Sequence, residues 1–171
     1  LESQIASISD DVAYNNHDVE DALRAGLISL DSLKEISYFD EIIRNINSLY
    51  KNIDESLTTY QVLRTSISKM VNDIILNSNK NIINNNIKDI NDVFHSKTFL
   101  ISMSEKMKND SVLIKNFLYA NVYNHIKLKQ KRNEVENIIK KLFAYYLKNF
   151  DKLPKDWSIQ KKEESENRII C

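Results

Sequence analysis

Three residues near the start of this chain, Asp10, Tyr14 and Asp18, have side chains and a spacing that could do chemistry. Because they follow one another at intervals of four, they form one stripe about 12 Å long on an α-helix, where successive residues turn by about 100°. Two carboxylates and a phenol on one face can hold a metal ion, a sugar hydroxyl group and the sugar ring between them. The spacing therefore indicates a small-molecule site on a single helix.

The helix that has to carry this stripe is predicted over residues 2–25. Apolar residues recur along it at roughly helical spacing, at Ile5, Ile8, Val12 and Val19. Gly26 is the only glycine of the chain, and it follows the pattern at a point where helices commonly end in a left-handed conformation. We therefore expect the helix to end at Ala25.

The composition indicates an all-α protein. One glycine and one proline among 171 residues leave little turn chemistry for β-hairpins. With 42% hydrophobic and 28% charged residues, the balance is that of a soluble helical protein rather than a disordered chain. The length fits one domain, so residues 1–171 are expected to form a single helical bundle.

Further helices are expected wherever apolar residues recur at intervals of three and four. Ser29 and Asp31 are both possible N-caps of a short helix that runs to about Phe39. The other predicted ranges are 40–50, 56–76, 111–127, 133–150 and 161–170. The Asn-rich residues 77–91 are expected to form a loop or a frayed helix. Pro154 is expected to stop the helix that precedes it. No strand and no internal repeat is predicted.

Charge, hydropathy and cysteine content argue against several classes of protein. The 24 basic residues cancel the 24 acidic ones, which argues against a nucleic-acid-binding surface over the whole molecule. No apolar run approaches the ~18 residues of a membrane span, and no secretory signal is recognisable. Cys171 is the only cysteine, so no internal disulfide can form, and a cytoplasmic location is expected.

The stripe lies within a longer run that contains, in this order, Ala6, Asp10-Asp11, Ala13-Tyr14, Asn15-Asn-His-Asp18 and Leu23-Arg-Ala-Gly-Leu27. This run resembles the last metal-ligand helix of the deoxyguanosine triphosphate triphosphohydrolases, a family of HD-domain phosphohydrolases. Two later segments also resemble blocks of this family, Phe117–His125 continuing to Trp157, and Arg168–Cys171. The resemblance implies that residues 1–27 are the last metal-ligand helix of an HD domain and that residues 28–171 form the C-terminal helical region.

This resemblance implies a role for each residue of the stripe. Asp10 corresponds to the final aspartate ligand of the metal. Asp11 is the competing choice, although helical geometry turns it about 100° away from the stripe. Tyr14 corresponds to a tyrosine that packs on the deoxyribose, and Asp18 to an aspartate that accepts a hydrogen bond from the 3′-hydroxyl group. Arg64 falls where the family tends to carry an arginine, which could meet phosphate oxygens or pair with an acid of its own helix.

The three histidines do not complete such a metal site. His17 and Asp18 spell the family's His-Asp pair, but adjacent helical residues diverge by about 100° and would not chelate one ion. His17 is therefore expected beside the site or in solvent. His125 is expected in the core or at an interface, and His95 is the remaining histidine. No His…His-Asp segment precedes Asp10, so the other ligands and the family's catalytic histidine are expected to lie outside this chain.

The family resemblance implies metal-dependent hydrolysis of dGTP or another dNTP to a deoxynucleoside and inorganic triphosphate, with Mg²⁺ or Mn²⁺. One aspartate cannot hold a catalytic divalent ion. The chain, interpreted as a C-terminal part, is therefore expected to bind no metal and to be inactive alone. The alternative is a non-catalytic helical remnant or interaction module that self-associates or complements a partner chain. Both interpretations imply association, as a homo-oligomer or with the missing half.

Overall fold

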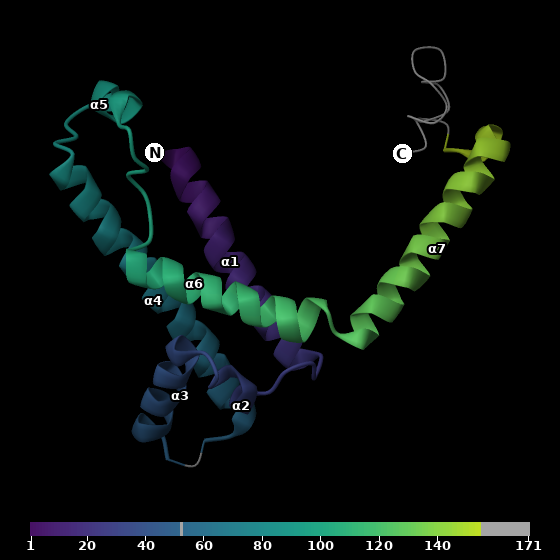
Figure 1. Cartoon of the computed structure of the whole chain (residues 1–171), viewed down its shortest axis with the longest axis horizontal. Coiled ribbons are helices and arrows are strands. Elements are labelled where there is room, and N and C mark those ends of the chain that lie inside the picture. Colours follow the sequence, from purple (N-terminus) through teal and green to yellow (C-terminus); the bar gives the residue numbers. More distant parts are fainter. Residues whose placement is uncertain (52, 155–171) are drawn as a thin grey trace. The chain divides into compact units, whose positions relative to one another are not determined.

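The computed structural model describes residues 1–51 and 53–154, which are helical and contain no strand. The elements are α1 (Glu2–Arg24), α2 (Leu30–Leu33), α3 (Ser37–Leu49), α4 (Glu55–Asn84), α5 (Ile90–His95), α6 (Glu105–Leu118), the π-helix η1 (Tyr119–Tyr123), α7 (Ile126–Lys148) and the short 3-10 helix η2 (Phe150–Lys152) (Figure 1). The all-α prediction is confirmed. The chain divides into unit 1, residues 1–123, and unit 2, residues 124–171, and each is described by itself. The single-domain interpretation stays a prediction.

α1 ends as its sequence predicts, because Gly26 takes up a left-handed conformation with a φ of +63°. The Gly26 amide donates to the Leu23 carbonyl oxygen at 3.0 Å, and the Leu27 amide donates to the Ala22 carbonyl oxygen at 2.9 Å. These two bonds form a Schellman motif, which satisfies carbonyl groups that the end of a helix would otherwise leave free. The observed helix ends at Arg24, one residue before the predicted end.

The short helix predicted to run to about Phe39 is divided between two elements, so its length was wrong, whereas Ser29, one of its two predicted N-caps, does cap α2. The Ser29 hydroxyl accepts from the Ser32 amide at 3.2 Å, and the Ser32 hydroxyl accepts from the Ser29 amide at 3.0 Å, which caps α2. After this single turn Ile36 is extended, and α3 begins at Ser37. Burial accounts for the break, because Leu33 and Ile36 are both buried in the core.

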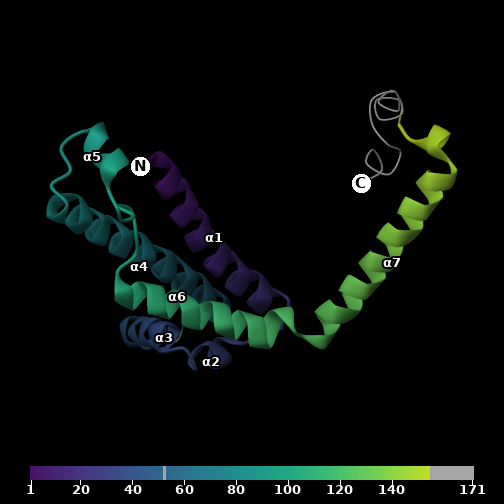
Figure 2. The same cartoon turned by 45° about the horizontal axis from the view of Figure 1, so that its top comes forward.

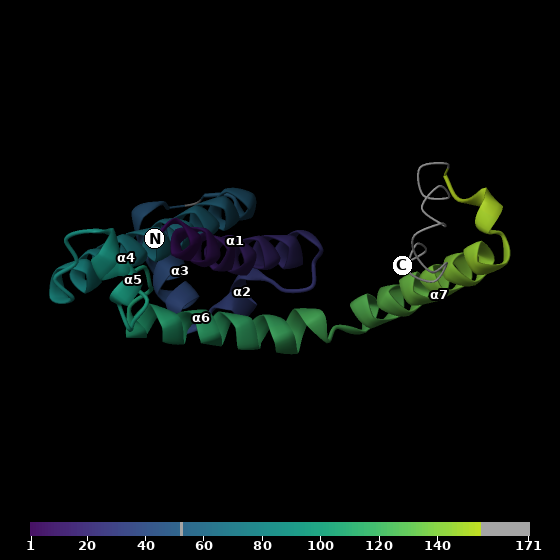
Figure 3. The same cartoon turned by 90° about the horizontal axis from the view of Figure 1, so that it is seen from above.

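The core of unit 1 forms where α4 packs against α1 and α3 and where α1 packs against α6. Figure 2 shows α1 and α4 lying side by side with α6 crossing them, and in Figure 3 α6 runs along one edge of the unit. Tyr38 is buried in this core and donates to the Ser66 carbonyl oxygen at 2.8 Å. Burial raises the pKa of Tyr38 to about 12. The large apolar side chains that are fully buried are Phe39, Leu33, Ile42, Met70, Leu100, Ile114, Leu118, Val19 and Val62.

α4 continues to Asn84, although its Asn-rich composition predicts a loop or a frayed helix from residue 77 onward. Two of these asparagines bind residues 98–104, a non-helical segment that we call the strap. The side-chain amide nitrogens of Asn77 and Asn81 donate to backbone carbonyl oxygens of the strap at 3.0 to 3.1 Å. The loop prediction was wrong for residues 77–84, because tertiary hydrogen bonds stabilise a helix whose residues have low intrinsic propensity.

The end of the strap sets the start of α6. Ser104 is the N-cap of this helix, since its hydroxyl group accepts from the Met107 amide at 3.2 Å. Asp73 of α4 in turn accepts from the Ser104 amide at 2.8 Å and from the Ser104 hydroxyl group at 2.6 Å. α4 therefore determines where α6 begins and which of its side chains face α1.

The helices predicted over residues 111–127 and 133–150 are replaced by α6, η1 and α7. The break between helices falls at residues 124–125, whereas the sequence places it between residues 127 and 133. α7 ends at Lys148, followed by Asn149 with a φ of −132°, so Pro154 is not the residue that stops it. These boundaries were wrong because no glycine or proline marks the observed break. The helix predicted over residues 161–170 lies outside the described residues.

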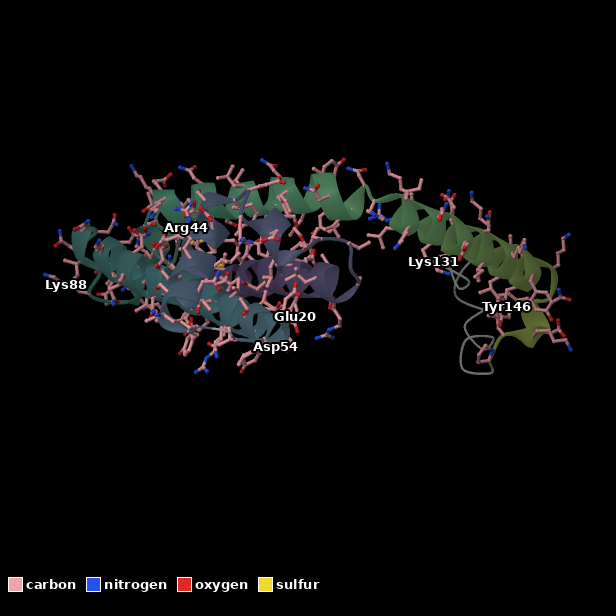
Figure 4. All side chains as sticks on the ribbon, turned by 90° about the horizontal axis from the view of Figure 1, so that it is seen from below. Glu20, Arg44, Asp54, Lys88, Lys131 and Tyr146 are labelled. Carbon is pink, nitrogen blue, oxygen red and sulfur yellow. The ribbon has the colours of Figure 1, made fainter. Side chains whose placement is uncertain are left out.

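α7 belongs to unit 2, of which the structure describes residues 124–154. None of its side chains is buried within the described part of the chain. Figure 4 shows Lys131 and Tyr146 projecting from this helix. The same figure labels Arg44 of α3 in unit 1, which pairs with Asp40. Apolar side chains stand about half exposed along one face of α7, at Val135, Ile138, Ile139, Leu142 and Tyr145. Within residues 1–51 and 53–154 no helix is long and apolar enough to cross a membrane.

Candidate active site

α1 presents the predicted stripe on the side that faces away from the core. Asp10 and Tyr14 are exposed and Asp18 is half-buried. Tyr14 keeps 52% of its surface exposed, so one side of its phenol ring remains free to pack against a ligand. The opposite face of α1 is buried through Val12, Asn15, Asn16, Val19 and Ala22.

A cavity of about 500 Å³ lies beside this stripe, where α1 meets α6 and η1. The structure therefore brings Asp10 and Tyr14 together in one cavity. Carboxylates, an amine, an amide and phenols face the same space, a combination that can bind a polyhydroxylated anion. We call this space the stripe cavity, and it is lined by Asp10, Asp11, Tyr14, Lys115, Asn116, Tyr119 and Tyr123.

The hydroxyl group of Tyr123 contacts two residues of the stripe, Tyr14 and Asp18. It donates to the Asp18 carboxylate and lies 3.1 Å from the Tyr14 hydroxyl oxygen. Burial raises the pKa of Tyr123 above its usual range, and the hydrogen bonds with Asp18 and Tyr14 raise it further. Tyr123 is the last residue of η1, and π-helical turns of this kind are frequent at functional sites.

Lys115 brings a positive charge to the stripe cavity. Its Nζ lies 2.9 Å from Oδ1 of Asp11, across the contact between α6 and α1. Asp11 thus turns toward a neighbouring helix, one of the two surroundings that helical geometry predicts for it. Asp10 makes no hydrogen bond or ion pair with the described residues, so its carboxylate is available to a ligand.

The sequence analysis missed Lys115, Tyr119 and Tyr123. Their signal is nevertheless in the sequence, because these three residues are spaced four apart like Asp10, Tyr14 and Asp18. A cation and two phenols therefore form a second stripe along α6 and η1. They were missed because nothing in the sequence indicates which helix this second stripe faces.

A buried hydrogen bond holds these two stripes against each other. Asn15 is fully buried in α1, and its side-chain nitrogen donates to the Ser111 hydroxyl oxygen of α6 at 2.8 Å. Buried polar groups of this kind are costly unless they are paired, so the bond specifies how the helices meet. The register that it sets brings Lys115 opposite Asp11.

Arg64 is not brought to the stripe cavity. It is exposed on α4 and makes no hydrogen bond or ion pair with the described residues. It also does not line the stripe cavity, which α4 does not reach. A phosphate contact by Arg64 stays a prediction, whereas the alternative, an ion pair with an acid of α4, is not formed.

Each described histidine contacts a residue that is close to it in sequence. His17 is exposed, with Nδ1 3.8 Å from a Glu20 carboxylate oxygen. The Nδ1 of His95 lies 2.7 Å from the Asn91 carbonyl oxygen, and the His125 ring accepts from the Lys127 amide at the start of α7. His125 therefore caps a helix rather than filling the core.

A divalent metal does not fit the described residues by themselves. Within residues 1–51 and 53–154 no group of three or more His, Cys, Asp or Glu side chains could hold a metal ion. Asp10 offers one oxygen-donor group, and Mg²⁺ or Mn²⁺ needs several. The described residues alone therefore cannot hold a catalytic metal ion.

Residues 101–171 match the family model of the phosphohydrolase-associated domain. Three curated relatives bear the name deoxyguanosinetriphosphate triphosphohydrolase-like protein. The one from Bartonella tribocorum is 31% identical over 174 residues, which cover 100% of this chain and 44% of that protein. The one from Bartonella henselae is 34% identical over 157 residues (92% and 39%), and the one from Caulobacter sp. strain K31 is 31% identical over 173 residues (99% and 44%).

Over almost its whole length the chain is similar to part of these deoxyguanosinetriphosphate triphosphohydrolase-like proteins. It fits a C-terminal part of these triphosphohydrolase-like proteins and spans about two fifths of their length. The resemblance found in the sequence is thereby confirmed. The match to the phosphohydrolase-associated domain begins in the strap and includes α6, η1 and α7, so it covers the elements that supply Lys115 and Tyr123.

Proposed function

We propose that this chain forms the nucleotide-binding side of a metal-dependent dNTP triphosphohydrolase site, which acts on dGTP or a related dNTP. The observation that carries the proposal is the stripe cavity, where Asp10 and Tyr14 of α1 face Lys115 and Tyr123 of the second stripe. The names of the relatives support the same class of reaction. The products are a deoxynucleoside and inorganic triphosphate.

The sugar is the part of the substrate that this chain is best equipped to bind. Tyr14 packs its exposed ring on the deoxyribose, and Asp18 accepts a hydrogen bond from the 3′-hydroxyl group. An ionised carboxylate has about four acceptor positions, so Asp18 can keep the bond from Tyr123 while it accepts a second one. A ring that packs where a 2′-hydroxyl group would project discriminates against ribonucleotides.

The triphosphate is placed next to Lys115. This ammonium group carries the positive charge of the stripe cavity, and phosphate oxygens accept strong hydrogen bonds from such groups. Asp10 supplies one ligand to a divalent metal such as Mg²⁺ or Mn²⁺, and the remaining ligands come from residues outside these 171. We therefore expect the chain alone to be inactive.

An apolar groove indicates where the residues that complete the site would dock. The groove, of about 580 Å³, runs between α1 and α4, and Ser9, Ala13 and His17 form its edge on α1. Asp10 and Tyr14 do not line the groove, although each directly follows a residue that does, so a segment that fills it would contact the face of α1 next to the stripe. Its lining is otherwise largely aliphatic and includes Ile5, Ile8, Val12, Ile67, Val71, Ile74, Ile75, Ile82 and Ile101.

The test is release of inorganic triphosphate from dGTP in Mn²⁺. We expect none from the 171-residue chain alone. Release should appear after addition of the part of the Bartonella henselae relative that the chain does not match. Asp10→Ala should abolish it, whereas Asp21→Ala, at an exposed acid of the same helix, should not. If the chain alone released triphosphate in an Asp10-dependent reaction, a site completed by a second polypeptide would be contradicted. If the two polypeptides formed a stable complex that remained inactive, the proposed triphosphohydrolase function would be refuted.

A second candidate function is that of a non-catalytic helical module that associates with itself or with a partner. Exposed apolar faces favour it, in the α1–α4 groove and along Val135, Ile138 and Leu142 of α7. Such faces commonly mark interaction sites. Light scattering should then show an oligomer of the purified chain, and a monomer at all concentrations would count against this function.

A further inference from the structure

An ion pair crosses the stripe cavity between residues that are 104 positions apart in the chain, Asp11 and Lys115. Both side chains line this cavity next to Asp10 and Tyr14. Both also line a larger cavity, of about 970 Å³, whose other walls carry mostly polar side chains such as Asn77. The ion pair therefore stands where the two cavities meet, and an anion in the stripe cavity meets both of its members.

The ion pair is weak enough to exchange partners. The Asp11 side chain is 53% exposed and the Lys115 side chain 47% exposed. Exposed pairs between flexible side chains contribute little to stability because water and salt screen them. The ammonium group of Lys115 can consequently leave Asp11 for a phosphate oxygen at small cost.

The charges around the stripe cavity make Asp11 unfavourable for an anionic ligand. The charged side chains of its lining are two carboxylates, Asp10 and Asp11, and the single ammonium group of Lys115. A phosphate group that takes the ammonium group leaves the Asp11 carboxylate unpaired at its side. The anion then faces a like charge that was neutralised before it arrived.

We propose that Asp11 is an internal competitor for the Lys115 ammonium group, which weakens the binding of a polyphosphate anion in the stripe cavity and speeds its departure. This inference rests on the proposed function, in which a triphosphate occupies the cavity. Lys115 turns from Asp11 to the phosphate when the anion binds, and the ion pair re-forms when the anion leaves. Asp11 thus acts on release of the triphosphate product and not on bond cleavage.

A purely structural role for the ion pair is the competing explanation, because it also joins α1 to α6. Two other contacts already join these parts of unit 1, the buried bond from Asn15 to Ser111 and the bond from Tyr123 to Asp18. Both are less exposed than the ion pair. The packing of α1 against α6 therefore does not depend on Asp11. If the ion pair had only a structural role, Asp11→Asn would not tighten the binding of an anion.

The size of the effect follows from two contributions. An exposed ion pair that has to break changes a binding constant by up to about fivefold. One like charge about 4 Å away in water changes it by about fivefold again. At low ionic strength we expect Asp11→Asn to tighten the binding of inorganic triphosphate by roughly tenfold, mainly through slower dissociation.

The probe is inorganic triphosphate itself, with affinities measured by calorimetry and dissociation rates by stopped flow on the full chain. Lys115→Met should weaken binding. In the Lys115→Met background Asp11→Asn should give a smaller gain, of about fivefold, because only the like-charge contribution remains once the lysine is gone. Asp31→Asn is the matched control. It removes the same charge from an exposed pair, with Lys34 at 2.6 Å, and does not line the stripe cavity.

Three results would overturn the inference: unchanged affinity in Asp11→Asn, a gain of the same size in the Lys115→Met background, or no triphosphate binding by any variant. A gain as large in Asp31→Asn would also overturn it, because net charge would then suffice. The proposed function fails separately, through the dGTP hydrolysis assay, whatever the triphosphate affinities are.

Discussion

Replacing Tyr123 with phenylalanine removes one hydroxyl group from the point where η1 meets α1. That hydroxyl donates to the Asp18 carboxylate and lies 3.1 Å from the Tyr14 hydroxyl oxygen. A hydrogen bond to a charged group contributes about 1.5–3 kcal/mol when it is well buried. Asp18 is half-buried, so water can replace part of the bond. We therefore expect Tyr123→Phe to lower the free energy of unfolding by about 1–2 kcal/mol at neutral pH.

The effect of this substitution should depend on pH with a defined sign. The pKa of Tyr123 is raised in the folded chain, first by burial and then by its hydrogen bonds with Asp18 and Tyr14. An unfolded tyrosine titrates near pH 10. The stabilisation from a raised pKa is fully present below that pH and is lost as the pH rises toward the folded value. The difference between wild type and Tyr123→Phe should therefore shrink above about pH 10.

Urea unfolding followed by circular dichroism measures both effects. A double-mutant cycle with Asp18→Asn should give a coupling energy of about 1 kcal/mol, because the two side chains share one bond. Tyr60→Phe is the matched control, since Tyr60 is an exposed tyrosine of α4 without a hydrogen bond to the described residues. Additive effects of Tyr123→Phe and Asp18→Asn would refute the reasoning.

Two further substitutions test the fold. Gly26→Ala should lower the free energy of unfolding by about 1 kcal/mol, because the residue keeps a φ of +63° while a Cβ would meet no atom within 4 Å. A stabilised variant in urea unfolding would contradict that account. Tyr38→Phe should lose less stability at high pH than the wild type does. The pKa of Tyr38, about 12, exceeds that of an unfolded tyrosine by about two units. This difference corresponds to a stabilisation of at most about 3 kcal/mol, which the wild type loses between about pH 10 and 12. Thermal melts across this range would show an equally steep loss in the variant if the argument is wrong.

Local signals were sufficient to predict the carrier of the first stripe. Ile5, Val12 and Val19 have helical spacing, and Gly26 can adopt the left-handed conformation at little cost, so α1 and its end follow from neighbouring residues alone. Because α1 could be predicted, the shared face of Asp10 and Tyr14 followed from their spacing of four residues.

Contacts between distant residues decided what the sequence could not. α4 extends through its Asn-rich end because Asn77 and Asn81 bind the strap, which lies about twenty residues further along the chain. Tyr123 belongs to the candidate site because η1 meets α1, a contact across more than 100 residues. Propensity and periodicity carry no information on such pairs. The role of Arg64 was expected from the family resemblance alone, and Arg64 does not line the stripe cavity.

The strap has a consequence for how this protein avoids unwanted association. A non-helical segment in a helical protein presents backbone donors and acceptors that no helix satisfies and that another chain could bind. Side chains occupy them here: Asn77 and Asn81 donate to strap carbonyls, while Gln4 and Ser78 accept from strap amides at 3.0 to 3.1 Å. The side chains of α1 and α4 thus satisfy the backbone groups of the strap, which has no neighbouring strand in the described part of the chain. Loss of these side-chain partners would leave backbone groups of the strap open to water or to another chain.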